Sequence, residues 1–290
     1  MSKICVVHLV RAQNGIEPFS NFIESYLKNP SGIEHDLLIV FKGFSLSSAK
    51  EAYLKLLAPL RFSTLEVTDA GFDITAYFAA FECYADKYCY FCFLNSFSVI
   101  QDSEWLSKLY NQISQPGVGL VGATGSWQSH RSLHWAWLPI SMIIAAAQHY
   151  RLYKGKPIHT RLVLGAVGSC QHGSFFWDYD PFPNYHLRTN AFMIAGALMG
   201  RIKRPEIKSK MDAYRFESGK KSLTRQILKM GQAVLVIGKN GKAYEISNWK
   251  DSETFWQSDQ GNLLVADNQT RDYQNGDARR RKYLSTMAWG

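Results

Sequence analysis

Long apolar runs are missing from this sequence. No segment of the 290 residues reaches the roughly 18–20 consecutive apolar residues that a membrane-spanning helix needs. The run within Met1–Val10 is at the short limit for the core of a signal peptide, and no small-residue cleavage site follows it. We therefore expect a cytoplasmic protein whose first residues form a strand, with peripheral contact at the inner membrane left open.

Cysteine is scarce and odd in number, with five residues at irregular spacing. A disulfide framework normally uses an even number of cysteines, so we expect reduced thiols, as in cytosolic proteins. Cys89 and Cys92 form a Cys-x-x-Cys pair, but they lie in a predicted strand, where residues three apart face opposite sides. The geometry therefore argues against a metal or redox site at this pair.

Several nucleotide-binding signatures are also absent. No Gly-x-Gly-x-x-Gly follows the first predicted strand and no Walker-type loop occurs, which argues against dinucleotide-dependent enzymes and NTPases. No nucleic-acid-binding signature is visible, so we expect no nucleic acid partner. Lys and Arg number 33 against 24 Asp and Glu, a net charge of +9 that favours anionic ligands such as phosphorylated compounds.

The sequence does contain a regular alternation of short apolar runs and segments of helical periodicity. Helical spacing is clearest over Phe19–Leu27, Ser45–Leu60 and Ile74–Asp86. Alternating strands and helices favour a parallel sheet with right-handed crossovers, covered on both faces. The fold class predicted is therefore α/β, with one mainly parallel sheet built from residues 4–10, 36–41, 64–67, 88–94 and 118–122.

Two segments depart from this alternation. Residues 124–185 are interpreted as an insertion, with a polar loop, an apolar helix over Leu138–Tyr150 and an aromatic loop interrupted by prolines. The basic and aromatic flanks of that helix leave open a contact with a membrane surface, although we favour a buried helix. Residues 245–290 form a C-terminal extension. Because no repeat or linker is visible, we treat the chain as a single domain.

Polar clusters follow two of the predicted strands. Asp69–Asp73 comes after the strand at 64–67, and Asn95–Ser98 directly follows the strand at 88–94. In an open α/β sheet, ligands bind beyond the carboxyl ends of the strands. We therefore expect both clusters to lie at one ligand-binding edge.

This layout resembles the GT-A class of nucleotide-sugar glycosyltransferases, in particular the rhamnan-synthesis glycosyltransferases of bacterial surface-polysaccharide biosynthesis. The resemblance covers the order of elements over about residues 1–125 and 185–240. It implies a GT-A-like fold and transfer of a hexosyl or deoxyhexosyl group from a nucleotide-sugar donor to a saccharide or lipid-linked acceptor. The segments that carry it are Val10–Gly15, Asp69–Ile74, Phe93–Ser98 and Glu217–Gly219.

Further residues are candidates for ligand binding because of their side-chain chemistry. Arg188 is favoured as a phosphate ligand because its guanidinium is a bidentate fork, whereas Lys220 and Lys221 suit a solvated face. The candidates for the acceptor site are Trp127, Trp177 and His186. The candidates for the nucleotide sugar are Arg11, Asn14, Asp69, Asp73, Asn95, Ser96, Ser98, Arg188 and Asn190. For Asp69 and Asp73, capping of the helix near Ile74 is an equal alternative.

Glu217 resembles the carboxylate that serves as general base in inverting members of the class, where it would take a proton from the acceptor hydroxyl. The alternative is a carboxylate in the first turn of a helix, near its positive end. Asp180, in the aromatic loop, is the second catalytic candidate. It belongs to Asp178-Tyr179-Asp180, which is formally an Asp-x-Asp but lies elsewhere in the order of elements.

The class holds a divalent cation with an Asp-x-Asp, and here that position reads Asn95-Ser96-Phe97-Ser98. An amide and two hydroxyls are poor ligands for Mg²⁺ or Mn²⁺, which prefer carboxylate and phosphate oxygens. Either cationic side chains balance the diphosphate or other residues hold a metal, so a metal cofactor is left open. A competing hypothesis is a carbohydrate- or polyanion-binding protein without catalysis, on a degenerate transferase fold.

Overall fold

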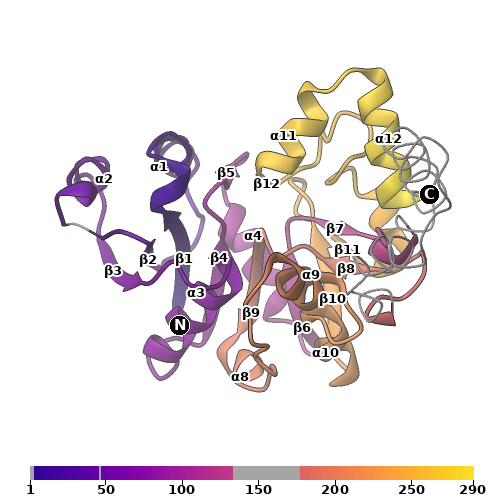
Figure 1. Cartoon of the computed structure of the whole chain (residues 1–290), viewed down its shortest axis with the longest axis horizontal. Helices are drawn as coiled ribbons and strands as arrows, with labels where there is room; N and C mark the ends of the chain where they lie inside the picture. The colour runs from indigo at the N-terminus through magenta and orange to yellow at the C-terminus, as the bar shows by residue number, and fades with distance from the viewer. Residues whose placement is uncertain (1–2, 46, 133–176) are drawn as a thin grey trace, which may run out of the picture.

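The computed structural model describes residues 3–45, 47–132 and 177–290. One eight-stranded sheet organises this part of the chain, in the order β11-β10-β6-β9-β4-β1-β2-β3 (Figure 1). Its strands are β1 (Ile4–Arg11), β2 (Asp36–Lys42), β3 (Phe62–Val67), β4 (Tyr90–Leu94), β6 (Val118–Gly122), β9 (Ala191–Ala195), β10 (Ala233–Ile237) and β11 (Ala243–Tyr244).

The sheet is mainly parallel. β1 pairs in parallel with β2 and β4, β2 with β3, and β6 with β10. All five apolar runs predicted as strands belong to this sheet, so the predicted α/β fold class with one mainly parallel sheet is confirmed. β9 is antiparallel to both of its neighbours, β4 and β6. β9 was not among the strands predicted from the sequence.

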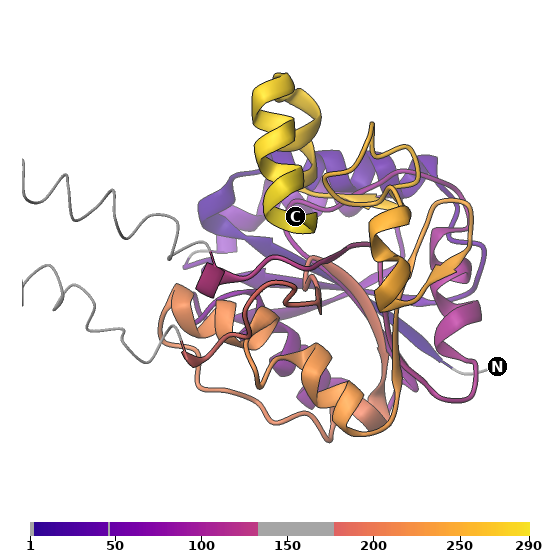
Figure 2. The same cartoon turned by 90° about the vertical axis from the view of Figure 1, so that its right-hand side faces the viewer.

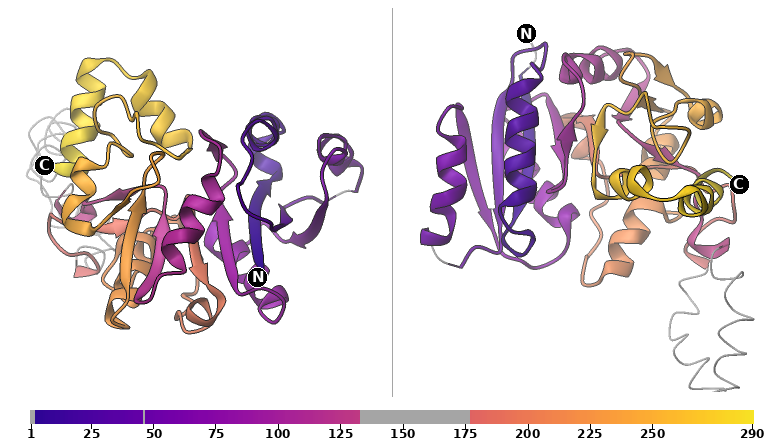
Figure 3. Two further views of the ribbon diagram at one scale, coloured as in Figure 1. Left: turned by 180° about the vertical axis from the view of Figure 1, so that it is seen from behind. Right: turned by 90° about the horizontal axis from the view of Figure 1, so that it is seen from above.

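Helices cover both faces of the sheet (Figure 3). They are α1 (Glu17–Lys28), α2 (Glu51–Leu57), α3 (Asp73–Tyr84), α4 (Trp105–Ile113), α8 (Gly196–Met199), α9 (Lys210–Ser218), α10 (Leu223–Lys229), α11 (Asn268–Asn275) and α12 (Ala278–Trp289). Alternate residues of β1 face opposite sides, as the pleat requires. Val6 packs in the core under α1, α2 and α4, and Val7 packs in the core under α3 and α10.

Glycines end one helix and turn one hairpin, and one predicted helix is shorter than expected. Gly231, with φ of 74°, follows the end of α10, and Asn240-Gly241 joins the antiparallel pair β10 and β11. The single helix predicted over Ser45–Leu60 is instead a 3₁₀ turn (Ser47–Lys50) followed by the shorter α2. Cys89 is exposed whereas Cys92 is buried, so this pair does not converge on one site.

The C-terminal segment packs against the rest of the chain. β12 (Val265–Ala266) pairs with β5 (Val99–Ile100), which directly follows the β4 tip. Trp289, at the end of α12, packs edge to face on Trp127. Figure 2 shows α12 at the upper edge of the sheet.

β7 (Gly125–Ser126), at the start of the predicted insertion, pairs antiparallel with β8 (His186–Leu187), which directly follows the insertion. The helix predicted over Leu138–Tyr150 lies outside the described residues. Within the described ranges, every helix is too short or too polar to cross a membrane.

Candidate active site at the carboxyl ends of the strands

Charged residues end three adjacent strands. Arg11 is the last residue of β1, Lys42 is the last of β2, and Asp69 follows β3. The guanidinium of Arg11 meets Asp69 as a fork, with Nε 2.7 Å from Oδ1 and Nη2 3.0 Å from Oδ2. These hydrogen bonds lower the pKa of Asp69 and raise the pKa of Arg11. The ion pair between Arg11 and Asp69 therefore links the end of β1 to the segment after β3, across the end of β2.

Lys42 is a functional candidate that the sequence did not single out. It is fully buried, and its Nζ donates to Ala70 O at 2.7 Å and to Thr68 O at 3.3 Å. Burial lowers its pKa, whereas the negative charges of Asp69 and Asp73 oppose that shift. Lys42 thus fixes the segment after β3. The sequence did contain a signal for this residue, because Lys42 directly follows a run of apolar residues that predicts a buried strand.

Two carboxylates from distant parts of the chain lie near enough beside this segment to interact electrostatically. Asp73 is the first residue of α3, and Glu217 lies in the last turn of α9. Burial raises the pKa of Asp73 to about 6; the positive charges of Lys42 and Arg11 oppose the rise, and the negative charge of Glu217 adds to it. A carboxyl group that titrates near neutral pH is suited to proton transfer or to hydrogen-bond donation.

The position of Glu217 corrects one prediction. It lies at the C-terminal end of α9 rather than in a first helical turn, and α10 starts only at Leu223, capped by Ser222. The negative end of a helix disfavours a carboxylate, so this placement brings no dipole stabilisation. Thr189 Oγ1 donates a hydrogen bond to Glu217 Oε2 at 3.0 Å. The helix-start alternative for Glu217 is therefore wrong.

The capping alternative for Asp69 and Asp73 is also wrong. The N-cap residue of α3 is Phe72, and no side chain caps this end. Asp69 is instead held by Arg11, and Asp73 is already inside the helix. Both aspartates are thus free of capping and lie at the ligand edge.

The tip after β4, Asn95–Ser98, is a turn closed by its own side chains. Asn95 Oδ1 accepts hydrogen bonds from Phe97 N and Ser98 Oγ, both at 3.1 Å. Asn95 N donates to Asn190 O at 2.8 Å. Asn95, Ser96 and Ser98 are all buried. Because Thr189 binds Glu217 and Asn190 binds the tip, the carboxylate pair and the tip lie on either side of Thr189–Asn190.

This tip does not fit a divalent cation. It offers no carboxylate, and Asn95 Oδ1, the oxygen best suited to a hard cation, already accepts two hydrogen bonds within the turn. Asn190 Oδ1 likewise accepts from Thr124 Oγ1 at 2.8 Å. Across the described ranges, no group of three or more His, Cys, Asp or Glu side chains is arranged to hold a metal ion.

Several predicted residues are held elsewhere by internal contacts. Arg188 is buried, with Nη2 2.7 Å from Asp267 Oδ2 and its guanidinium 4.2 Å from the ring centroid of Phe255. His186 is buried, its Nδ1 is 2.9 Å from Asn184 O, and burial lowers its pKa to about 4. The structure thus gives neither Arg188 nor His186 an open face toward a ligand.

The Asp178-Tyr179-Asp180 segment does not form a joint metal site. Asp178 pairs with Arg215 at 2.7 Å, and Asp180 pairs with Arg225 at 3.0 Å. The two carboxylates are therefore each balanced by an arginine from a different helix.

The remaining candidates lie apart from the carboxylate pair. Trp127 is half-buried against Trp289, and Trp177 is 66% exposed beneath the guanidinium of Arg131. Asn14 ends the 3₁₀ turn Ala12–Asn14 after β1 and is partly exposed. The side chains of Lys220 and Lys221 are exposed, as a solvated face predicts.

The sequence matches no protein-family model and no curated protein. Among solved structures, the mannosyltransferase PcManGT from Pyrobaculum calidifontis, in complex with GDP-Man and Mn²⁺, is 11% identical with a TM-score of 0.47, over 81% of this chain and 54% of that chain. Mouse xyloside xylosyltransferase 1 is 10% identical with a TM-score of 0.40, over 79% and 81%. The 1–349 segment of S. aureus TarS is 14% identical with a TM-score of 0.40, over 72% and 52%.

The chain therefore spans about half the length of the mannosyltransferase and of the 1–349 segment of TarS. The TM-scores are below 0.5, so these matches assign neither substrate nor activity to this chain. The function must follow from the residues at the strand ends.

Proposed function

We propose that this protein is a glycosyltransferase that moves a hexosyl or deoxyhexosyl group from a nucleotide-sugar donor to a saccharide or lipid-linked acceptor, as in bacterial surface-polysaccharide biosynthesis. The observation that carries the proposal is the proximity of Asp73 and Glu217 at the carboxyl ends of a mainly parallel sheet, where the pKa of Asp73 is raised to about 6. This is the edge at which α/β folds bind ligands.

Glu217 is the proposed general base. Thr189 occupies Oε2, and no described residue donates a hydrogen bond to Oε1. Oε1 can therefore accept the proton of an acceptor hydroxyl while the oxygen of that hydroxyl attacks the anomeric carbon. The bond between that carbon and the diphosphate oxygen breaks, and its electron pair leaves with the nucleoside diphosphate. Attack opposite the leaving group gives inversion at the anomeric carbon.

The strand ends supply the proposed donor site. Asp69, held by Arg11, and Asn14 lie beyond β3 and β1, where a nucleoside can reach their polar atoms. Asp73 is the proposed contact for a donor hydroxyl, because a carboxyl group with a pKa of about 6 can either donate or accept a hydrogen bond near neutral pH.

A lipid-linked acceptor would bring the enzyme to the cytoplasmic face of the inner membrane. The net charge of +9 supports such a peripheral contact, because anionic lipid head groups attract basic proteins. We include this location in the proposal.

A donor screen tests the function. Purified protein is incubated with radiolabelled UDP-, GDP- and TDP-sugars and a panel of saccharide and lipid-linked acceptors. Thermal unfolding is measured with the corresponding nucleoside diphosphates. We expect one nucleotide to raise the unfolding temperature and its sugar to be transferred. Nucleotide binding without transfer to any acceptor would favour the non-catalytic alternative, and the absence of both would reject a nucleotide-sugar enzyme.

A further inference from the structure

The proposed reaction needs a positive charge next to the leaving diphosphate, and the residues considered so far do not supply it. Arg11 is forked onto Asp69, Arg188 is buried against Asp267, and Lys42 points at two backbone carbonyls. The β4 tip lacks the carboxylates that would hold a divalent cation. A further cation near the tip would complete the site.

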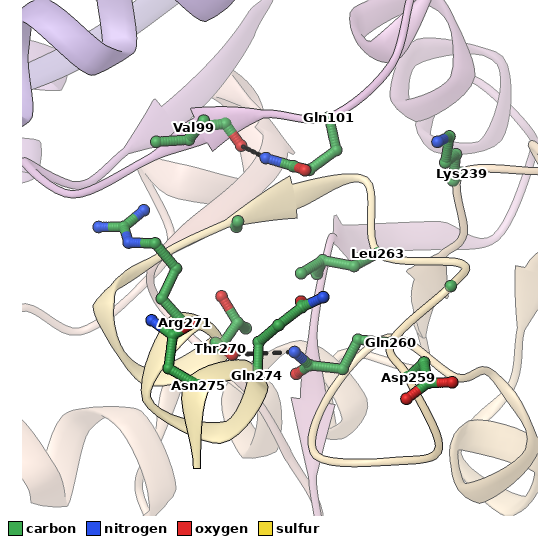
Figure 4. A pocket seen from close by; sticks show the side chains of 12 residues that line it. Val99, Gln101, Lys239, Asp259, Gln260, Leu263, Thr270, Arg271, Gln274 and Asn275 are labelled. Atoms are coloured by element: carbon green, nitrogen blue, oxygen red, sulfur yellow. Dashed lines mark hydrogen bonds between the residues drawn. The ribbon is translucent and has the colours of Figure 1, made fainter.

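Arg271, on α11, lies at that tip. Its Nη1 donates to Phe97 O at 3.2 Å. No carboxylate lies within ion-pair distance of its guanidinium in the part of the chain that the structure describes. Figure 4 shows the guanidinium extending from α11 toward Val99, next to the tip. Its charge is therefore not neutralised by a described partner.

The backbone that carries Arg271 is held in place by buried contacts. Asp267 caps α11, with Thr270 N 2.9 Å from Asp267 Oδ1 and Asp267 N 2.7 Å from Thr270 Oγ1. The second oxygen of Asp267 pairs with the buried Arg188. β12 precedes α11 and pairs with β5. Arg271 is thus pre-positioned at the tip, which reduces the cost of ordering it when a ligand binds.

Open space borders Arg271 on two sides. One cavity of about 400 Å³ lies between β5 and α11, and Lys239 is part of its lining (Figure 4). A second of about 400 Å³ lies between α1 and β5, lined in part by Lys28 and Glu24. Asp259, in the first cavity, already pairs with Arg281 at 3.2 Å. The charged residues that line the two cavities besides Arg271 are Lys239 and Asp259 in the first and Lys28 and Glu24 in the second, and an anionic ligand can approach Arg271 through this open space.

We infer that Arg271 binds the diphosphate of the donor at the β4 tip and compensates the charge that a divalent cation compensates in Asp-x-Asp enzymes. This inference rests on the proposed function. A guanidinium can donate two parallel hydrogen bonds to phosphate oxygens. When the bond between the anomeric carbon and the diphosphate oxygen breaks, the negative charge grows beside Arg271, while the acceptor proton goes to Glu217. The guanidinium stays protonated throughout.

The test measures nucleotide binding rather than turnover. The nucleoside diphosphate that stabilises the protein most among UDP, GDP, TDP, CDP and ADP is titrated calorimetrically in EDTA, and the matching nucleoside is titrated in parallel. We expect Arg271→Gln to weaken diphosphate binding about 10- to 100-fold, as expected for lost hydrogen bonds to a charged group. Binding of the nucleoside should be unchanged, because it lacks the phosphates.

The matched control is Arg279→Gln, which removes the same charge from an exposed position on the adjacent α12. It should leave affinity unchanged. Arg271→Lys keeps the charge without the fork and should bind with intermediate affinity, and it serves as the second variant if the unfolding temperature of Arg271→Gln is lowered.

Three outcomes would overturn the inference. Equal diphosphate affinity of Arg271→Gln and the unmodified protein would remove Arg271 from the site while leaving the proposed function intact. Binding that disappears in EDTA and returns with Mn²⁺ would assign the charge compensation to a metal. Failure of the unmodified protein to bind any nucleoside diphosphate, with or without Mn²⁺, would reject the proposed function itself.

Discussion

Thr189 donates a hydrogen bond from its Oγ1 to Oε2 of Glu217 over 3.0 Å, and the carbonyl of the next residue, Asn190, accepts one from the amide of Asn95. The two residues after Arg188 therefore fix the orientation of the proposed base on one side and the β4 tip on the other. The hydrogen bond from Thr189 orients one oxygen of Glu217, and the proposed base function of Glu217 can be tested by substitution.

Glu217→Gln should reduce transfer about 10²- to 10⁴-fold, the usual contribution of a general base. Glutamine keeps the shape and can still accept from Thr189, but it does not take the acceptor proton. Nucleoside diphosphate affinity should change little, because the base faces the acceptor. Steady-state transfer and nucleotide affinity are measured on the same protein. Glu206→Gln, at an exposed position, is the control, and unchanged turnover of Glu217→Gln would leave Asp180 as the catalytic candidate.

Asp73→Asn should change how stability depends on pH. The pKa of Asp73 is about 6 in the folded protein against 3.8 for the ordinary group, so the folded state retains the proton longer as pH rises. The contribution of Asp73 to the free energy of unfolding is therefore full below about pH 4 and is lost as pH rises through about 6. The asparagine variant does not titrate.

The free energy of unfolding of Asp73→Asn minus that of the unmodified protein should therefore rise by about 1–3 kcal/mol between pH 4 and pH 7 in urea unfolding. Asp69→Asn is the control, because its free energy of unfolding relative to the unmodified protein should change with pH in the opposite direction. The hydrogen bond from Arg11 lowers the pKa of Asp69, so its contribution is present at neutral pH and lost on acidification. If this free-energy difference had the same dependence on pH for both variants, burial would not raise the pKa of Asp73 as described.

Lys42→Met should move the pKa of Asp73 above about 6. The positive charge of Lys42 opposes the burial of the Asp73 carboxyl, and methionine keeps the apolar stem while removing that charge. The measurement is an NMR titration of the aspartate carboxyl carbons, with Asp73→Asn identifying the signal. Lys50→Met, which removes a lysine paired with Glu66, is the control and should leave the pKa of Asp73 unchanged. A pKa that stays or falls in Lys42→Met would show that the two charges do not interact.

Asp267→Ala should destabilise the protein by about 3–5 kcal/mol, because it leaves the buried guanidinium of Arg188 without its partner. Asp277→Ala removes a helix cap of the same type from α12, where Asp277 Oδ1 accepts from Arg280 N at 2.7 Å without a buried ion pair. It should cost about 1 kcal/mol. Equal losses in urea unfolding would show that the ion pair contributes nothing beyond the cap.

Most of the sheet was predictable from the sequence because each of its first strands is a local apolar run. β2, for example, has five consecutive apolar residues bordered by charged residues, and the alternation with helices predicted its parallel direction. The direction of β9 was not predictable, because it depends on pairing with β4 and β6, which are distant in sequence.

The errors at the candidate site have two different origins. Glu217 was placed at a helix start because the capping box of Ser209 and Asp212, which begins α9, was not recognised; this signal was present in the sequence. The burial of Arg188 was beyond local analysis, since its partner Asp267 is supplied by the C-terminal segment. Arg271 was missed for the same reason, because only the pairing of β12 with β5 brings α11 to the tip.

The central position of β9 also sets an order of assembly. β4 and β6 are synthesised before residue 125, yet neither pairs with the other, and the strand that joins them ends only at Ala195. On the ribosome, both edges therefore stay unpaired while the following residues emerge, a state in which exposed strand edges favour misassembly. Thr189 and Asn190 enter together with β9, so Glu217, which follows in α9, can be oriented relative to the tip only after this strand has joined β4 and β6.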